Sequence, residues 1–240
     1  MALFIRKYMK IVSGKIVELC AFNASVTITP RSPRGQPTDP DHQARNVAAI
    51  VRKVARLLNC NFSNKDYFVT LTYSESAYIR LCTGMPDGLS EDDRLAYVYG
   101  QARKELDRFI RRCQYACKKA KVPLYFVGVT ADRDRVDPTD KRIHHHLVVN
   151  GAAGEIVKRT WQNGYTRLDH LSNDDDYTRV AFYMITQTRH EKRKSRYKAS
   201  RNLKQPVIDT ALSLDVWDIP TNIKAAMDTQ DYAYYCISKS

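Results

Sequence analysis

The sequence predicts an α+β fold with one central, largely antiparallel sheet and flanking helices. Three β-branched or aromatic runs are typical of strands covered on both faces, and they lie at 67–73, 124–130 and 143–149. Two longer segments, near 40–59 and 91–121, place apolar residues at helical spacing. With a further helix expected at 174–188, this order favours an antiparallel sheet backed by helices, although spacing alone does not fix the topology.

The chain divides into three predicted segments. Residues 1–40 alternate apolar and polar side chains around Ser13-Gly14, which predicts a β-hairpin followed by an arm rich in Pro, Gly and Arg. Residues 41–206 form the main domain, in which we expect 74–90 to be a loop. Residues 207–240 are a C-terminal extension. Apolar and polar residues alternate only weakly there, so the pattern predicts no particular helix or strand.

The composition of the chain indicates what kind of protein it is and which partners it can bind. A length of 240 residues with 43% hydrophobic residues can bury a core and excludes global disorder. The formal net charge of +13 favours a polyanionic partner, most often nucleic acid, over a merely basic protein. No apolar run approaches the roughly 18 residues that a membrane span needs, so we expect no membrane partner. Six cysteines without a Cys-x-x-Cys pair, and no signal-like N-terminus, predict a cytoplasmic protein.

Three consecutive histidines lie in the apolar run that ends at Asn150-Gly151. Because side chains alternate along a strand, His144 and His146 face one side and His145 faces the other. Two imidazoles on one rigid face can hold a metal ion between them. The alternative is a pair of hydrogen-bonded core histidines, but three of the six histidines in one apolar strand favour the metal pair, with His145 packed.

Two tyrosines lie on the helix expected at 174–188. Tyr177 belongs to the apolar stripe of that helix, which predicts a core contact. Tyr183 lies on the flank of the stripe, one turn from Arg179 and Gln187, which are polar groups able to steady a phosphate.

Several short motifs occur in an order that resembles a known family. They are Phe68-Val-Thr-Leu-Thr-Tyr73, His144-His-His146, Trp161-x-x-Gly164 and Tyr183-Met-Ile. This order is similar to that of rolling-circle replication initiators of the HUH endonuclease superfamily. Leu57-Leu-Asn-Cys-Asn-Phe62 and Ser200-Arg-Asn-Leu-Lys-Gln-Pro206 resemble more particularly the bacterial rolling circle replication-associated proteins. The resemblance covers about residues 33–206.

The resemblance implies an RRM-like sheet on which His144, His146 and a third polar group bind Mg²⁺ or Mn²⁺. A tyrosine then nicks single-stranded or hairpin origin DNA, leaving a 5′-phosphotyrosyl link and a free 3′-OH. Tyr183 coincides with the family's tyrosine, and Tyr177 is the alternative. No Walker-type loop is visible in the sequence, so unwinding would require a separate host or element helicase.

The third metal ligand and the cleavage activity are the points at which this chain departs from the family's pattern. Asp132 is the candidate ligand, near the place where the family tends to have Glu, and Asp134 is the weaker one. The family also usually has Lys three or four residues after its tyrosine, where this chain has Thr186 and Gln187. A single-tyrosine transposase of the same superfamily and a catalytically inactive DNA-binding protein are therefore the alternative functions.

A basic stretch from 189 to 204 carries eight Lys or Arg against one Glu and predicts a solvated, mobile segment. The basic side chains of this stretch can bind phosphates and the ring of Tyr197 can stack on a base, which suits single-stranded DNA. The predicted DNA contacts are Arg179, Arg189, Lys192, Arg193, Lys194, Arg196, Tyr197 and Arg201. A disordered charge run without function is the alternative.

Overall fold

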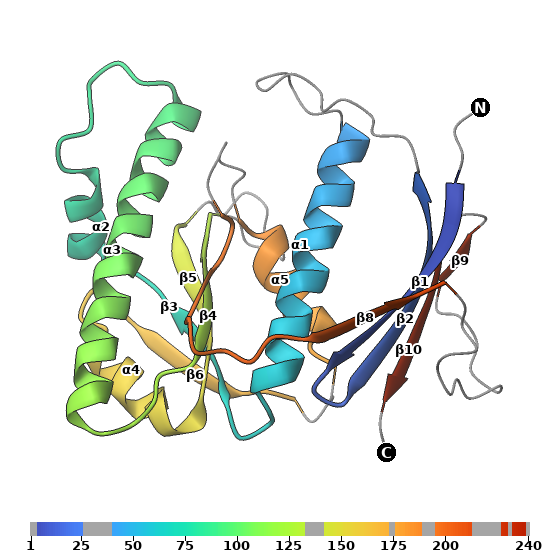
Figure 1. The fold of residues 1–240 in the computed structure, drawn as a ribbon. Helices are drawn as coiled ribbons and strands as arrows, with labels where there is room; N and C mark the ends of the chain where they lie inside the picture. The colour runs from blue at the N-terminus through green and yellow to red at the C-terminus, as the bar shows by residue number, and fades with distance from the viewer. Residues whose placement is uncertain are drawn as a thin grey trace.

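The computed structural model describes residues 4–25, 40–132, 142–172, 176–188, 195–212, 227–229 and 232–238. The chain forms two antiparallel five-stranded sheets with helix α1 between them (Figure 1). The α+β class with antiparallel strands is confirmed. None of the described helices combines the length and the apolar composition that a membrane crossing needs.

The central sheet has the strand order β6 (Thr166–His170), β3 (Tyr67–Leu71), β5 (His144–Val149), β4 (Phe126–Ala131), β7 (Lys198–Ala199). The helices are α1 (Pro40–Asn61), α2 (Glu75–Cys82), α3 (Glu91–Lys119), α4 (Gly154–Thr160) and α5 (Thr178–Thr186), and a short 3₁₀ turn (Gly151–Ala153) precedes α4. The three predicted central strands are therefore neighbours in one sheet, as the sequence predicts.

Helices cover both faces of the central sheet, which is why every residue of β4 and all but the first residue of β5 are buried. On one face, Leu106 and Phe109 of α3 pack against Val69 and Leu147. On the other face α1 and α5 contribute to a second core cluster, whose members include Val54, Leu58, Val127, Val129, Val148 and Met184. Strand β5 thus lies between two layers of helices. Alternate residues of β5 face opposite layers.

Helix α2 was not predicted, and the expectation of a loop over 74–90 is wrong for residues 75–82. Ser74 caps the helix because its side-chain oxygen accepts a hydrogen bond from the Ala77 backbone N–H at 3.3 Å. Ala77 and Leu81 are its buried residues, one turn apart, and Leu81 packs with Val98 of α3. Helix α2 follows the C-terminal end of β3, and its Leu81 shares a core cluster with Ile143, the residue before β5.

The second sheet joins the two ends of the chain. Its strands are β8 (Val207–Ala211), β1 (Phe4–Ser13), β2 (Ile16–Ser25), β10 (Tyr232–Ser238) and β9 (Met227–Thr229), in this spatial order. The predicted hairpin is confirmed, with its turn at Gly14. The extension expected from 207 onwards supplies three strands of that sheet, and the arm at 26–39 lies outside the described residues.

Residues 195–204 are packed along the molecule, so the prediction of a mobile segment is wrong for this part. Arg103 of α3 donates a hydrogen bond to the Ser195 carbonyl oxygen at 2.9 Å, and Lys198 forms an ion pair with Asp107. The Ser200 backbone N–H donates to the Phe126 carbonyl oxygen at 3.0 Å. Residues 189–194 lie outside the described residues.

Candidate active site

His144 and His146 lie on the same face of β5, toward α5, as the alternation predicts. Their Nε2 atoms are 2.9 Å apart and their ring centroids 4.6 Å apart. His146 is 2% exposed, whereas His144 is half-buried and reaches the surface. Two ring nitrogens that converge on one point are arranged as a pair of ligands for one ion.

The other ring nitrogen of each histidine is held by a neighbour. His144 Nδ1 lies 2.9 Å from the Arg142 carbonyl oxygen, which can only accept, so Nδ1 carries the proton and Nε2 keeps its lone pair. His146 Nδ1 lies 3.2 Å from the Thr70 hydroxyl on the neighbouring strand β3. By the same argument Gln187 Oε1, 3.2 Å from His146 Nε2, accepts from Nε2–H, and Nδ1 accepts from the Thr70 hydroxyl. Metal binding at His146 Nε2 would therefore release this proton.

Gln187 supplies the third polar atom beside the pair. Its Oε1 lies 3.2 Å from His146 Nε2, and the side chain is buried. The amide Nε2 of Gln187 is buried without a hydrogen-bond partner among the described residues. The contact of Oε1 with His146 therefore sets the orientation of the Gln187 side chain. Amide oxygens are ordinary ligands of Mg²⁺ and Mn²⁺, so the donor set fits such an ion.

Sequence reasoning considered Gln187 as a phosphate neighbour of Tyr183 and as a position where the family usually has Lys, but not as a metal ligand. The available signal was the spacing, because residues four apart on a helix lie on one face. Gln187 follows the last residue of α5, and its carbonyl oxygen accepts a hydrogen bond from the Asp132 backbone N–H at 3.2 Å. The helix end and the end of β4 are therefore joined next to the histidines.

Asp132, the predicted third ligand, directly follows β4, whose last residue Ala131 pairs with His144. Its side chain is only 1% exposed, and it is joined to Gln187 through backbone atoms. Within the described part of the chain, no three His, Cys, Asp or Glu side chains gather closely enough to share a metal ion. The structure therefore does not assemble Asp132 with the two histidines, and Asp134 lies outside the described residues.

The two candidate tyrosines have different surroundings. The ring centroid of Tyr183 lies 5.1 Å from that of His146 and 5.9 Å from that of Phe68, and Tyr183 is half-buried. Tyr177 is 4% exposed in the core between α1 and α5, and its backbone N–H donates to Asn59 Oδ1 at 2.8 Å. The interpretation of Tyr177 as a core contact is confirmed.

Tyr183 and both histidines line one open cavity of about 1220 Å³. The other lining residues are Phe68, Thr70, Thr72, Tyr73, Glu75, Tyr78, Ile79, Arg142, Ile143, Arg167 and Asp169. Arg142 and Arg167 are exposed cations, and Arg167 forms an ion pair with Asp169 at 2.8 Å. Sequence reasoning missed both arginines, because only the strand register places Arg167 beside Thr70.

His145 is fully buried on the opposite face of the sheet, as predicted. Its Nε2 lies 2.7 Å from the Tyr73 hydroxyl and its Nδ1 lies 3.1 Å from the Thr130 hydroxyl. Burial, with smaller contributions from the neighbouring His144 and His146, lowers the pKa of His145 to about 3. His145 is thus a neutral, hydrogen-bonded core residue directly behind the candidate ligands.

The predicted DNA contacts are only partly described. Arg179 and Arg201 are exposed, and Arg196 is half-buried. Tyr197 is half-buried and packs against the core beneath α1 and α5, so its ring is not the freely exposed stacking surface that the sequence suggests. Arg189, Lys192, Arg193 and Lys194 lie outside the described residues.

A scan against protein-family models found no matching family, and searches of curated proteins and of solved structures found no match. What the site can do is therefore inferred from its geometry and from the motifs described above.

Proposed function

We propose that the chain is a metal-dependent endonuclease that nicks and rejoins single-stranded DNA through a tyrosine, as rolling-circle replication initiators of the HUH superfamily do. The observation that carries the proposal is the position of Tyr183 beside the histidine pair. Its ring lies 5.1 Å from His146, whose Nε2 is 2.9 Å from that of His144. A candidate nucleophile and two imidazole side chains thus line one cavity.

The residues that would hold the ion are His144 and His146 through Nε2 and Gln187 through Oε1. When bound, Mg²⁺ or Mn²⁺ supplies positive charge that neutralises the phosphodiester and stabilises the charge that develops during attack. Imidazole ligands favour Mn²⁺ over Mg²⁺, because Mg²⁺ prefers oxygen ligands. Arg142 and Arg167 on the cavity wall offer further positive charge for the strand.

The reaction of Tyr183 balances without another reactant. Its phenol oxygen forms a bond to phosphorus, and the bond from phosphorus to the 3′ oxygen breaks with its electron pair. The phenol proton is lost and the 3′ oxygen gains one, which gives a 5′-phosphotyrosyl link and a free 3′-OH. Attack by that 3′-OH reverses each change and rejoins the strand.

Single-stranded DNA suits the cavity better than a duplex. Phe68, Tyr78 and Ile79 give its wall apolar surface against which unpaired bases can stack, and Ile79 is 62% exposed. The substrate would be the single-stranded or hairpin origin of a replicon. Unwinding of a longer duplex would depend on a separate helicase.

The test is adduct formation with a labelled pool of random single-stranded oligonucleotides and Mn²⁺, resolved on a denaturing gel. Wild-type protein should form an adduct that EDTA prevents. His144→Ala and His146→Ala should lose it while keeping metal-free DNA binding. His170→Ala is the matched control, because His170 is exposed on β6 and does not line the cavity.

Three results distinguish the alternatives. Wild-type adduct in EDTA, or full activity of His146→Ala, would contradict metal-dependent nicking. DNA binding without any adduct, with either metal, would favour the inactive binder. An adduct that requires hairpin ends of a mobile element in place of an origin would favour the transposase.

A further inference from the structure

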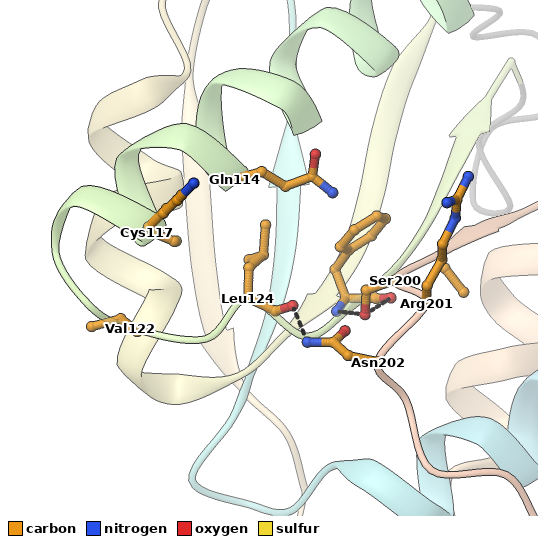
Figure 2. Close-up of a pocket in the computed structure, with 10 residues that line it drawn as sticks. Gln114, Cys117, Val122, Leu124, Ser200, Arg201 and Asn202 are labelled. Carbon is orange, nitrogen blue, oxygen red and sulfur yellow. Dashed lines mark hydrogen bonds between the residues drawn. The ribbon is translucent and has the colours of Figure 1, made fainter.

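A second cavity, of about 630 Å³, lies near the end of the central sheet opposite the histidines (Figure 2). Leu124 and Phe126 line it, at the start of β4. Phe126 pairs with Val149 at the end of β5, whereas His144 begins β5. The two ends of a six-residue strand are separated by roughly 17 Å, so this cavity is distinct from the candidate active site.

The walls of this cavity are basic and polar, and its base is apolar. Lys118 and Arg201 are exposed cations on opposite walls, and none of the described residues that line the cavity is acidic. Gln114 and Asn202 add two amide groups. Figure 2 shows Gln114 on the α3 side, Leu124 below it, and Arg201 on the side of the chain after β7.

The wall that carries Arg201 is held in place by hydrogen bonds on both sides of it. Ser200 Oγ accepts from the Phe126 backbone N–H at 3.1 Å, and the Ser200 N–H donates to the Phe126 carbonyl oxygen at 3.0 Å. Asn202 Nδ2 donates to the Leu124 carbonyl oxygen at 3.4 Å. The backbone of Arg201 is therefore fixed opposite α3, and the cavity does not depend on an unrestrained tail.

We propose that this cavity binds one nucleotide of the DNA strand, away from the nicking site. The phosphate would lie between Lys118 and Arg201, because two cations without a carboxylate favour an anion. The base would lie over Leu124 and Phe126, with its edge toward Gln114, since amides pair with base edges. A volume of about 630 Å³ is within the range of pockets for ligands of nucleotide size.

This inference rests on the proposed function, because the strand bound here is the strand that is nicked. A covalent link through Tyr183 retains only the fragment whose 5′ phosphate forms the link, and the fragment with the free 3′-OH is not held by it. A second binding site on the same strand would keep the substrate on the protein between nicking and rejoining, without any contact to the reacting atoms.

The experiment measures binding of a labelled single strand without metal, over a range of salt concentrations. Each lost phosphate contact on a single strand lowers the slope of log K against log salt by roughly 0.7. Lys118→Ala and Arg201→Gln should each show this decrease. Lys119→Ala is the matched control, because Lys119 is also an exposed lysine of α3 but does not line the cavity.

A steric variant tests the cavity without a change of charge. Gln114→Trp should fill the space and weaken binding several-fold, with a circular dichroism spectrum like that of the wild type. Equal slopes for Lys118→Ala and Lys119→Ala would overturn the proposal, as would wild-type affinity of Gln114→Trp or failure of the wild type to bind single strands. Absence of a wild-type tyrosine adduct, with the slope difference intact, would count against the nicking function alone.

Discussion

Three adjacent histidines have three different environments, although they share one side-chain chemistry. His144 reaches solvent and His146 is buried, yet both direct Nε2 to the same point. His145 faces the opposite core and bonds to Tyr73 and Thr130. The period of two along a strand places His144 and His146 on one face and His145 on the other, so these faces could be predicted from the sequence alone.

Gln187 should contribute to metal affinity more than Asp132 does. Gln187→Ala removes the oxygen beside His146 and should weaken Mn²⁺ binding by roughly 10- to 100-fold, whereas Gln187→Glu should retain binding because it keeps an oxygen ligand. Titration calorimetry with Mn²⁺ would measure this. A larger loss for Asp132→Asn than for Gln187→Ala would return the ligand role to Asp132.

His145 should make the stability of the protein depend on pH. Its pKa is lowered to about 3 in the folded state, so below its ordinary value near 6.5 the unfolded chain binds more protons. The stabilising contribution is complete above about pH 6.5 and is lost as the pH falls toward 3, by at most ~1.4 kcal/mol per pH unit.

Urea unfolding of the wild type and of His145→Leu at several pH values measures this effect. The variant should have a smaller pH dependence between 6 and 4. It should also be less stable at neutral pH by about 1–3 kcal/mol, because the hydroxyls of half-buried Tyr73 and buried Thr130 lose a partner. The same pH dependence in both proteins would contradict the assignment.

At the scale of elements, Trp161-x-x-Gly164 holds the segment that links β3 to α2. Trp161 Nε1 donates to the Thr72 carbonyl oxygen at 3.0 Å, and the Ser74 N–H donates to the Asn163 carbonyl oxygen at 2.8 Å. A Cβ at Gly164 would lie 2.2 Å from the Thr72 oxygen, so only glycine permits this approach. The motif therefore fixes one wall of the candidate active site.

Gly164→Ala should lower the free energy of unfolding by more than about 1 kcal/mol and reduce adduct formation, because the Thr72 backbone must shift. Gly100→Ala is its control. A Cβ at Gly100 meets nothing within 4 Å, and alanine should stabilise α3 by up to about 1 kcal/mol. Thermal unfolding of both variants checks the difference, and a Gly164→Ala protein as stable as the wild type would exclude this role.

Elements with long, strong periodicity could be predicted, and short or non-local features could not. Helices α1 and α3 and the three apolar strands follow from patterns over many residues. Helix α2 has only eight residues with two buried positions, which is too little periodicity to distinguish it from a loop. The contacts of Gln187 and Arg167 with the site depend on how distant segments pack, and charge alone suggested mobility where residues 195–204 are packed.

At the scale of the whole molecule, α1 connects the central sheet to the sheet that contains both chain ends (Figure 1). Arg56 of α1 forms a bidentate ion pair with Glu18 of β2, with a shortest distance of 2.6 Å. The carboxylate is nearly buried, so its negative charge depends on this arginine. Hydrophobic patterning alone did not reveal this connection.

Arg56→Met should destabilise the protein by about 3–5 kcal/mol, because it leaves the Glu18 charge buried beside an apolar side chain. The double variant Arg56→Met/Glu18→Leu should recover most of this loss. Chemical denaturation of the two variants would show it. Equal stability of the single and double variants would mean that the ion pair does not join the two sheets energetically.

The identity of the nucleophile tests the account as a whole most directly. Tyr183→Phe removes one hydroxyl, so it should preserve folding, Mn²⁺ binding and DNA affinity while abolishing the covalent adduct with labelled single-stranded DNA on a denaturing gel. Tyr177→Phe, which alters the buried tyrosine at the N-cap of the same helix, should still form the adduct. An adduct that survives in Tyr183→Phe and disappears in Tyr177→Phe would contradict the proposed site.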